Sequence, residues 1–232
     1  MIDKQKIKII IFDADDTLWE NETFFRAAEE EFCNMLEDYL PHHAVTKELY
    51  KKEVENVEWY GYGIKSFVLS MIETATSITG NTAGLSMVTR IIEIGREMMS
   101  KPVVLLDGVL DVLEALKGNY KLVVATKGDL VDQERKLNKS GIMHYFHHIE
   151  IMSEKGVADY RKLIRHLDSK PEEMVMIGNS LKSDVLPIIE LGGVGVHIPF
   201  HTTWELEVVK HQIDHDSFLK LNSIVDLLPY LT

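Results

Sequence analysis

Three aspartates stand within four residues at the end of a strand-like segment. Residues 9–19 read IIIFDADDTLW, in which β-branched and aromatic residues lead directly into Asp13, Asp15 and Asp16. Carboxylates this close repel one another, and a divalent cation bound among them would remove the repulsion. Oxygen ligands of this kind suit Mg²⁺. The spacing therefore indicates a magnesium site.

The elements that would position this cluster follow from the hydrophobic pattern. The Ile-rich run 6–12 predicts a buried strand. From residue 101 onward, helical and strand patterns alternate, with strands predicted at 120–126, 147–153, 173–179 and 195–199 and helices near 109–117, 130–141, 157–167 and 184–193. Such alternation predicts the α/β class, with a doubly wound, Rossmann-like parallel sheet between two layers of helices.

A block of purely helical pattern interrupts the predicted sheet domain after its first strand. Apolar residues recur at helical spacing in segments expected at 22–40, 45–57, 63–78 and 85–99, and Pro41 ends the first of these. We therefore expect two domains: an α/β core formed by residues 1–18 and 101–232, and an inserted all-helical domain formed by residues 19–100.

Polar residues follow several of the predicted strands. In a doubly wound sheet, ligands bind beyond the carboxyl ends of the strands. Asp13 and Asp15 follow the first strand, Thr126 closes the second, and the sequence GNSLKSD occupies 178–184 after a later one. We expect these groups to face one crevice.

Four short patterns resemble the motifs of the haloacid dehalogenase-like hydrolase superfamily. They are, in order, Asp-x-Asp-x-Thr from Asp13, the strand-closing Thr126, Lys155 before a helix, and Gly-Asn-Ser-x-x-x-Asp ending at Asp184. The resemblance extends over the whole chain, and the helical block stands where this family inserts a cap domain. It implies an enzyme of the phosphatase branch, a hydrolase of phosphoric monoesters with a helical cap.

The resemblance also implies a role for each motif residue. Asp13 would be the nucleophile that forms an aspartyl-phosphate, and Asp15 the general acid and base. Thr17 would hold the turn of the loop. Thr126 would donate its hydroxyl to a phosphoryl oxygen, and Lys155 would supply positive charge to the nucleophile and the transition state.

The magnesium ligands implied by the resemblance are the carboxylate of Asp13, the backbone carbonyl of Asp15 and a group of the 178–184 loop. That loop usually begins Gly-Asp in the family, whereas this chain has Asn179, whose amide oxygen can bind Mg²⁺ but carries no charge. Asp184 is the alternative ligand, or it acts on Lys155 and the metal-bound waters. Asp16 occupies a position that is more commonly Gly.

Three functional alternatives follow from the same residues. The dehalogenases that name the superfamily lack the second aspartate of the first motif, so Asp15 favours a phosphate substrate. A phosphomutase of the same fold would retain both aspartates. A non-catalytic phospho-acceptor protein is a second alternative. The third is a member of the fold that binds phosphorylated ligands without turnover, which Asn179 keeps open.

Substrate-binding residues are predicted in both domains. Lys127 and Gly128 follow Thr126 and would line its pocket. In the helical block, Trp59, Tyr60 and Tyr62 could stack on a nucleobase or pack against a sugar, or they could form the core of that domain. The substrate would be a small phosphorylated metabolite: a sugar phosphate, a nucleoside monophosphate or a phosphoglycolate-like acid.

Composition excludes several classes of partner. The formal net charge of -12, with no basic cluster, disfavours nucleic acid and anionic membrane surfaces. No apolar run approaches the ~20 residues that cross a bilayer, so we expect a cytoplasmic protein. Cys33 is the single cysteine and is expected in the core, and the ten histidines are expected to be scattered over the surface. The oligomeric state is left open.

Overall fold

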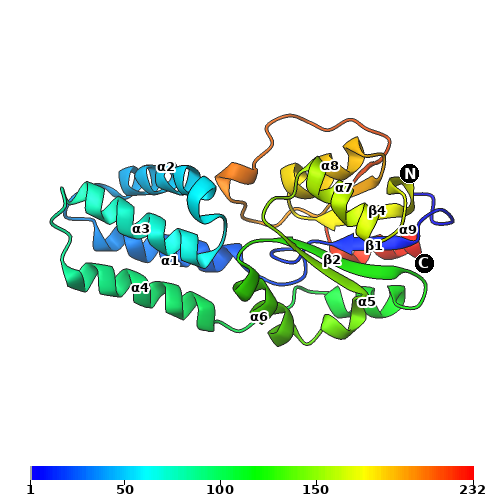
Figure 1. Cartoon of the computed structure of the whole chain (residues 1–232), viewed down its shortest axis with the longest axis horizontal. Coiled ribbons are helices and arrows are strands. Elements are labelled where there is room, and N and C mark those ends of the chain that lie inside the picture. The colour runs from blue at the N-terminus through cyan, green and yellow to red at the C-terminus, as the bar shows by residue number, and fades with distance from the viewer. Residues whose placement is uncertain (1) are drawn as a thin grey trace. The chain divides into compact units, whose positions relative to one another are not determined.

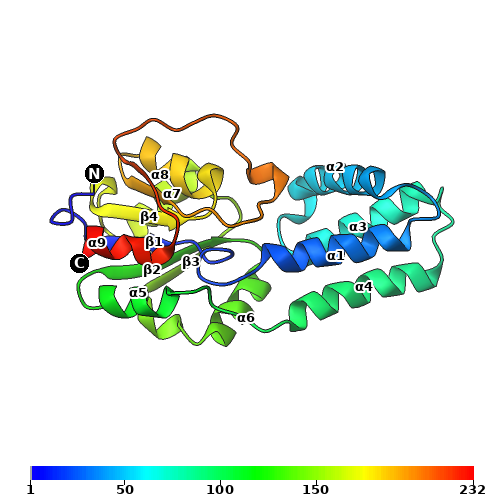
Figure 2. The ribbon, with the colours of Figure 1, turned by 180° about the vertical axis from the view of Figure 1, so that it is seen from behind.

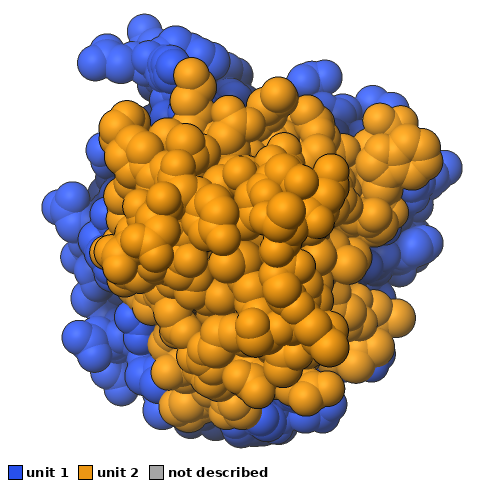
Figure 3. Space-filling model, turned by 90° about the vertical axis from the view of Figure 1, so that its left-hand side faces the viewer, with its two compact units in different colours: residues 1–22, 103–127, 133–232 blue, residues 23–102, 128–132 orange. Residues whose placement is uncertain are grey.

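The computed structural model describes residues 2–232, which divide into two compact units (Figure 1). The sheet unit comprises the residues up to 22 together with 103–127 and 133–232. The helical unit comprises 23–102 together with the short segment 128–132 (Figure 3). The chain thus passes between units after residues 22 and 102, where the sequence had predicted boundaries after 18 and 100. The grouping of 128–132 with the helices was not predicted.

The sheet unit is built on six parallel strands in the order β3-β2-β1-β4-β5-β6. The predicted α/β class is confirmed. The strands are β1 (Ile9–Phe12), β2 (Lys121–Lys127), β3 (His148–Met152), β4 (Met174–Gly178), β5 (Val194–His197) and β6 (Phe218–Lys220). The sequence analysis missed β6, because three residues are too few to show a periodic pattern.

Helices cover both faces of this sheet (Figures 1 and 2). Side chains of β1 alternate between two apolar clusters, because successive residues of a strand point to opposite faces. Ile10 and Phe12 pack in the cluster that includes α5, whereas Ile9 and Ile11 pack in the cluster that includes α7 and α8. The helices are α5 (Val109–Leu116), α6 (Leu130–Ser140), α7 (Val157–His166), α8 (Leu186–Glu190) and α9 (Leu228–Leu231).

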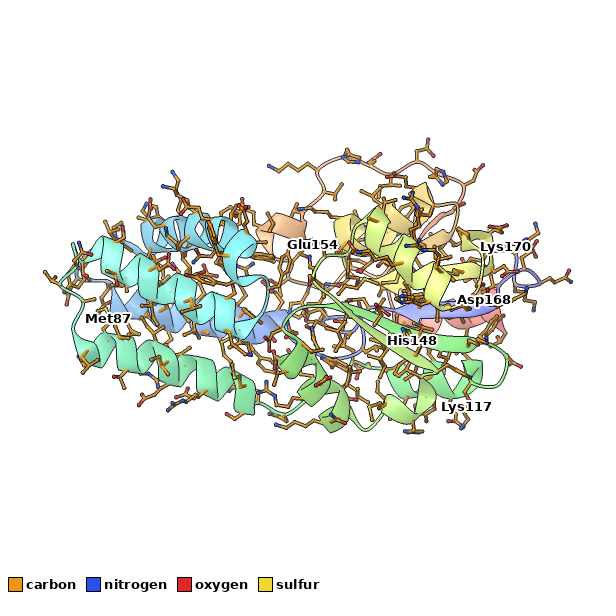
Figure 4. The ribbon with its side chains drawn as sticks, in the orientation of Figure 1. Met87, Lys117, His148, Glu154, Asp168 and Lys170 are labelled. Atoms are coloured by element: carbon orange, nitrogen blue, oxygen red, sulfur yellow. The ribbon has the colours of Figure 1, made fainter. Side chains whose placement is uncertain are left out.

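The carboxyl ends of the parallel strands lie together at one edge of the sheet. Figure 4 shows this for β3, where Glu154 lies just beyond the end of the strand and His148 lies at its start. Lys170, which precedes β4, lies toward the same edge as His148. The groups that follow β1, β3 and β4 therefore emerge at the edge marked by Glu154.

The helical unit packs four helices around their apolar faces: α1 (Glu22–Met35), α2 (His42–Tyr60), α3 (Ile64–Ile78) and α4 (Leu85–Ser100). Its core includes Cys33, as predicted, with Phe32, Leu49, Met71 and Ile91. Within residues 2–232, every helix is too short or too polar to cross a bilayer.

The bounds of the first two helices differ from the predicted ones by three residues or more. α1 ends at Met35, not at residue 40, and the chain continues in turns in which the N–H of Leu40 donates to the Leu36 carbonyl. The residue before a proline avoids helical geometry, so the chain leaves the helix ahead of Pro41. α2 runs to Tyr60, three residues beyond its predicted end, so Trp59 and Tyr60 form its last turn.

Candidate active site

Asp13 extends β1 into the loop that carries the first motif. Its N–H donates to the Ile177 carbonyl at 2.9 Å, so its backbone remains alongside β4. Thr17 closes the loop: its hydroxyl lies 3.2 Å from Asp13 Oδ2, and it accepts the N–H of Asn179 at 3.1 Å. Thr17 thus holds the turn, as predicted, and joins the loops after β1 and β4.

Asp16 has a structural position in the same loop. Its φ is +60°, in the left-handed region that glycine occupies freely and aspartate tolerates better than most residues. Its carboxylate accepts the backbone N–H groups of Asn21 and Glu22 at 2.9 and 3.0 Å. Burial raises its pKa to about 8, against the effect of these hydrogen bonds. Asp16 therefore fixes the exit of the loop toward α1.

Lys155 lies between two buried carboxylates. Its Nζ donates to Asp13 Oδ1 at 2.7 Å and to Asp184 Oδ1. The side chains of Lys155 and Asp184 are 2% and 1% exposed. The three residues follow β3, β1 and β4, so the strand ends bring together groups that lie 142 and 29 residues apart in the sequence. We call Asp13, Lys155 and Asp184 the buried triad.

Burial and charge act in opposite directions on the buried triad. Burial raises the pKa of Asp13 to about 7, with Lys155 opposing the rise and Asp184 adding to it. Burial also raises the pKa of Asp184. For Lys155, burial alone would lower the pKa, but the two carboxylates outweigh it and raise the pKa well above its usual value. One ammonium group thus pairs with two carboxyl groups. When all three groups are ionised, the triad carries one net negative charge.

Gly178 leaves the space that the Asp184 side chain fills. A Cβ on Gly178 would lie 2.1 Å from Asp184 Oδ2, so no other residue fits without moving the carboxylate. Oδ2 also accepts the N–H of Ser180 at 2.9 Å. Both oxygens of Asp184 are therefore engaged within the protein.

The helix that carries Asp184 begins earlier than predicted. A π-helical turn, Leu181–Val185, precedes α8 and places Asp184 inside the helix instead of at its start. Ser180 caps this turn, because its Oγ accepts the N–H of Ser183 at 3.0 Å.

Two side-chain oxygens near the first motif could bind a metal, one of Asp13 and one of Asn179. Asp13 Oδ2 and Asn179 Oδ1 lie 3.2 and 3.5 Å from the Thr17 hydroxyl, whose single proton can serve one of them. Within the described chain, no three His, Cys, Asp or Glu side chains gather into a metal-binding group. Two neighbouring oxygens that share one donor, beside a triad of net negative charge, nevertheless fit Mg²⁺.

Thr126 has a buried hydroxyl with no hydrogen-bond partner among residues 2–232. It lies on β2, two residues beyond the pair formed by Val124 and Phe12, so it reaches the edge where Asp13 leaves β1. A buried hydroxyl without a partner costs ~1–3 kcal/mol. The Thr126 hydroxyl therefore has an unused hydrogen-bonding capacity at this edge of the sheet.

Asp15 has partners that the sequence analysis did not identify. Trp19 Nε1 donates to its Oδ1 at 2.7 Å, and Gln133 Nε2 to its Oδ2 at 2.9 Å. Lys136 Nζ lies 2.6 and 2.7 Å from the two oxygens. Gln133 and Lys136 belong to α6, whose sequence contains no recognisable motif, so no local signal could have identified them.

Glu207 forms a second unpredicted centre beside the site. It lies on the long segment between β5 and β6, which is orange in Figure 2. Its carboxylate pairs with Lys127 at 2.7 Å and accepts the hydroxyls of Ser180 and Ser183, each at 2.5 Å. Burial alone would raise its pKa, but Lys127 and the serines outweigh burial and lower the pKa to about 2.

His197, expected at the surface, is instead buried on β5. Its Nε2 donates to the Asn179 carbonyl at 3.0 Å, because a carbonyl oxygen can only accept. Burial lowers its pKa, which favours the neutral imidazole. The loop that begins with Asn179 is thus held from β5, from Glu207 and from Thr17.

The predicted substrate-binding residues have different surroundings. Lys127 lies at the end of β2 and is paired with Glu207, whereas Gly128 groups with the helical unit. Trp59 and Tyr60 are 76% and 47% exposed, so the alternative that they form the helical core is wrong. Tyr62 is half-buried between Gly61 and Gly63. A role for the three aromatic residues in substrate binding stays a prediction.

Comparison with known proteins identifies the family. The model of the haloacid dehalogenase-like hydrolases matches residues 7–192. A haloacid dehalogenase-like hydrolase of Xanthomonas campestris has a solved structure that is 36% identical, with a TM-score of 0.85, over 94% of this chain and 87% of that one. The chain belongs to the haloacid dehalogenase-like hydrolase family, and the predicted family and hydrolase class are confirmed.

Two curated relatives carry more specific names. The glyceraldehyde 3-phosphate phosphatase of Methanopyrus kandleri is 28% identical over 83% of this chain and 84% of its own length. The pyrimidine 5'-nucleotidase YjjG of Escherichia coli is 31% identical over 38% of this chain and 41% of its own length. Both names describe hydrolysis of a phosphate ester.

Proposed function

We propose that the chain is a Mg²⁺-dependent phosphatase that hydrolyses small phosphoric monoesters through an aspartyl-phosphate on Asp13. The observation that carries the proposal is the buried triad, in which Lys155 fixes one oxygen of Asp13 at the edge where Thr126 presents its hydroxyl. The phosphatase names of the curated relatives support the reaction class.

The Mg²⁺ ion would be held by the Asp13 carboxylate, the Asp15 backbone carbonyl and the Asn179 amide oxygen. We favour Asn179 over Asp184 because both oxygens of Asp184 already bond Lys155 and Ser180. Asn179 Oδ1, in contrast, lies beside the Thr17 hydroxyl that also contacts Asp13. When bound, the ion would neutralise phosphate charge and align the ester for in-line attack.

The residues of the chain divide the reaction into two displacements. Asp13 attacks phosphorus while Asp15 protonates the leaving oxygen, and Asp15 then takes a proton from the water that hydrolyses the aspartyl-phosphate. Lys155 and Thr126 stabilise charge on the phosphoryl oxygens. The Lys155 charge also opposes the rise in the pKa of Asp13 that burial causes, and so favours its carboxylate form.

We propose that the leaving group carries no second anionic group. Lys127, Lys136 and Lys155 each pair with a carboxylate of the sheet unit, so their charges already have counterions. This arrangement favours sugar or aldehyde phosphates and nucleoside monophosphates over phosphoglycolate-like acids. The names of the two curated relatives, one an aldehyde phosphatase and one a nucleotidase, fit the same class.

The test is phosphate release from a panel of monoesters with Mg²⁺, with chelator and in the Asp13→Asn variant. We expect release that needs Mg²⁺ and is lost in D13N, with glyceraldehyde 3-phosphate turned over faster than phosphoglycolate. Asp16→Asn is the matched control, because an amide oxygen can still accept the N–H groups that Asp16 binds. Turnover that survives in D13N would contradict the mechanism, and phosphate moved between hydroxyls without release would favour the phosphomutase.

A further inference from the structure

The Asp15 carboxylate is held by donors from two directions. Trp19, on its own loop, is fully buried and contacts Oδ1. Gln133 and Lys136 approach from α6, where a spacing of three residues places them on the same helix face. Lys136 also donates to Asn21 Oδ1 at 3.2 Å, which fixes its ammonium beside the loop. The orientation of the carboxylate therefore depends on α6.

Gln133 joins Asp15 to the end of β2. One N–H of its amide donates to Asp15 and the other to the Lys127 carbonyl at 2.8 Å, next to Thr126. Its Oε1 is buried and has no partner among the described residues. The amide thus uses both donors and leaves its buried acceptor unsatisfied, which is unfavourable. The two hydrogen bonds that the amide donates, to Asp15 and to the Lys127 carbonyl, explain why it keeps this orientation.

The hydrogen bonds that Asp15 accepts differ in how easily each can break. Two ionised oxygens offer about four lone-pair directions. Trp19 uses one direction on Oδ1, Gln133 uses one on Oδ2, and Lys136 contacts both oxygens. Lys136 can therefore free either oxygen and still hold the other. A proton can then be exchanged at Asp15 while the carboxylate keeps its orientation.

We propose that Lys136 and Gln133 are positioning residues that orient the Asp15 carboxylate for proton transfer. The inference rests on the proposed function, in which Asp15 exchanges protons with the leaving group and with water. As the water oxygen bonds to phosphorus, one water proton passes to the Asp15 oxygen that Lys136 releases. The bond between phosphorus and Asp13 breaks, and its electron pair stays on Asp13.

The test separates the two displacements with two esters in the Lys136→Met variant. p-Nitrophenyl phosphate needs no proton on its leaving group, so Asp13 should still be phosphorylated rapidly and release a burst of about one nitrophenolate per enzyme. Turnover after the burst needs an oriented base and should fall about tenfold or more below wild type. Glycerol 2-phosphate, whose leaving alkoxide needs a proton, should lose its first turnover as well.

Lys139→Met is the matched control, because Lys139 is exposed on the same helix and the substitution removes the same charge. K139M should behave like wild type. Lys136→Gln, which keeps a donor, should recover part of the steady-state rate, and Gln133→Met should reproduce the burst followed by slow turnover. Variants with wild-type circular dichroism are compared, and Q133M keeps the test decisive if K136M does not fold.

Two results would overturn the inference. In the first, K136M and Q133M turn over both esters as fast as K139M. In the second, burst amplitude and steady-state rate fall together and equally for both esters, which is the signature of fewer folded molecules. Failure of the proposed function looks different, because the wild type would then release no nitrophenolate, or Asp13→Asn would release it as fast as the wild type.

Discussion

Each unit contains one cationic side chain that pairs with two carboxylates. The contact distances are similar in the two clusters, but one cluster is exposed to solvent and the other is buried. In the sheet unit, Lys155 pairs with Asp13 at 2.7 Å and also with Asp184. In the helical unit, Arg90 pairs with Glu31 and Glu97, each at 2.7 Å. The Arg90 side chain is 36% exposed, whereas that of Lys155 is 2% exposed.

The difference in exposure decides what each cluster can do. Water and salt screen the Arg90 pairs, so their formation changes little in free energy. The buried triad has lost its hydration, and a buried ion pair is often no more stabilising than apolar side chains of the same volume. A cluster that costs this much and adds so little stability is best explained by a chemical role. Ion pairs with similar contact distances therefore differ in energetic cost and in role, depending on whether they lie at the surface or in the interior.

Lys155→Met should have the largest effect, because it leaves Asp13 and Asp184 buried without a counter-charge. We expect phosphatase activity to fall ~10²–10³-fold, and the free energy of unfolding to fall by ~3–5 kcal/mol. The measurements are steady-state kinetics and urea denaturation. The double variant with Asp184→Asn should regain part of the stability and none of the activity. A K155M enzyme that keeps both properties would remove the distinction between the two clusters.

Asn179→Asp should strengthen Mg²⁺ binding, since a carboxylate replaces a neutral ligand beside Asp13. We expect the dissociation constant for Mg²⁺, measured by calorimetry without substrate, to fall about tenfold. The control is Asn138→Asp on α6, where the residue is exposed and hydrogen-bonded to the Glu134 carbonyl. An unchanged constant in N179D would return the ligand role to Asp184.

Glu207→Gln should have a smaller effect that depends on pH. The folded-state pKa of Glu207 is about 2, below its ordinary value of 4.5, so its charge stabilises the fold above about pH 5 and ceases to do so as pH falls toward 2. Wild type should exceed E207Q in unfolding free energy by ~1–3 kcal/mol near neutral pH. This gap should narrow in denaturation curves recorded between about pH 6 and pH 3. A gap that stays constant with pH would show that Lys127 and the serines do not hold the charge.

Arg90→Met should have the smallest effect. Its partners Glu31 and Glu97 become exposed carboxylates in water, so no buried charge is left unpaired. We expect an unchanged midpoint of urea denaturation and unchanged activity. The difference in midpoint between R90M and the wild type should also stay near zero as salt is added. A large loss of stability in R90M would contradict the comparison between the two cation clusters.

The sequence pattern predicted those site residues that directly follow the ends of parallel strands. Asp13, Lys155 and Asp184 come together because parallel strands end at one edge, and alternation of pattern reveals parallel strands. Glu207 was missed because a long segment without periodicity brings it back to the sheet. Lys136 was missed because a lysine in a helical pattern is ordinarily expected to be exposed to solvent. Contacts made through tertiary packing leave no local signal.

Trapping of the phosphorylated enzyme tests the central claim most directly. The protein is mixed with Mg²⁺ and p-nitrophenyl phosphate, quenched in acid during turnover and digested, and its peptides are sequenced by mass spectrometry. The account predicts one phosphoryl group on Asp13 in the wild type and none in Asp13→Asn. Turnover without any phosphorylated peptide, or with the phosphoryl group on another residue, would contradict it.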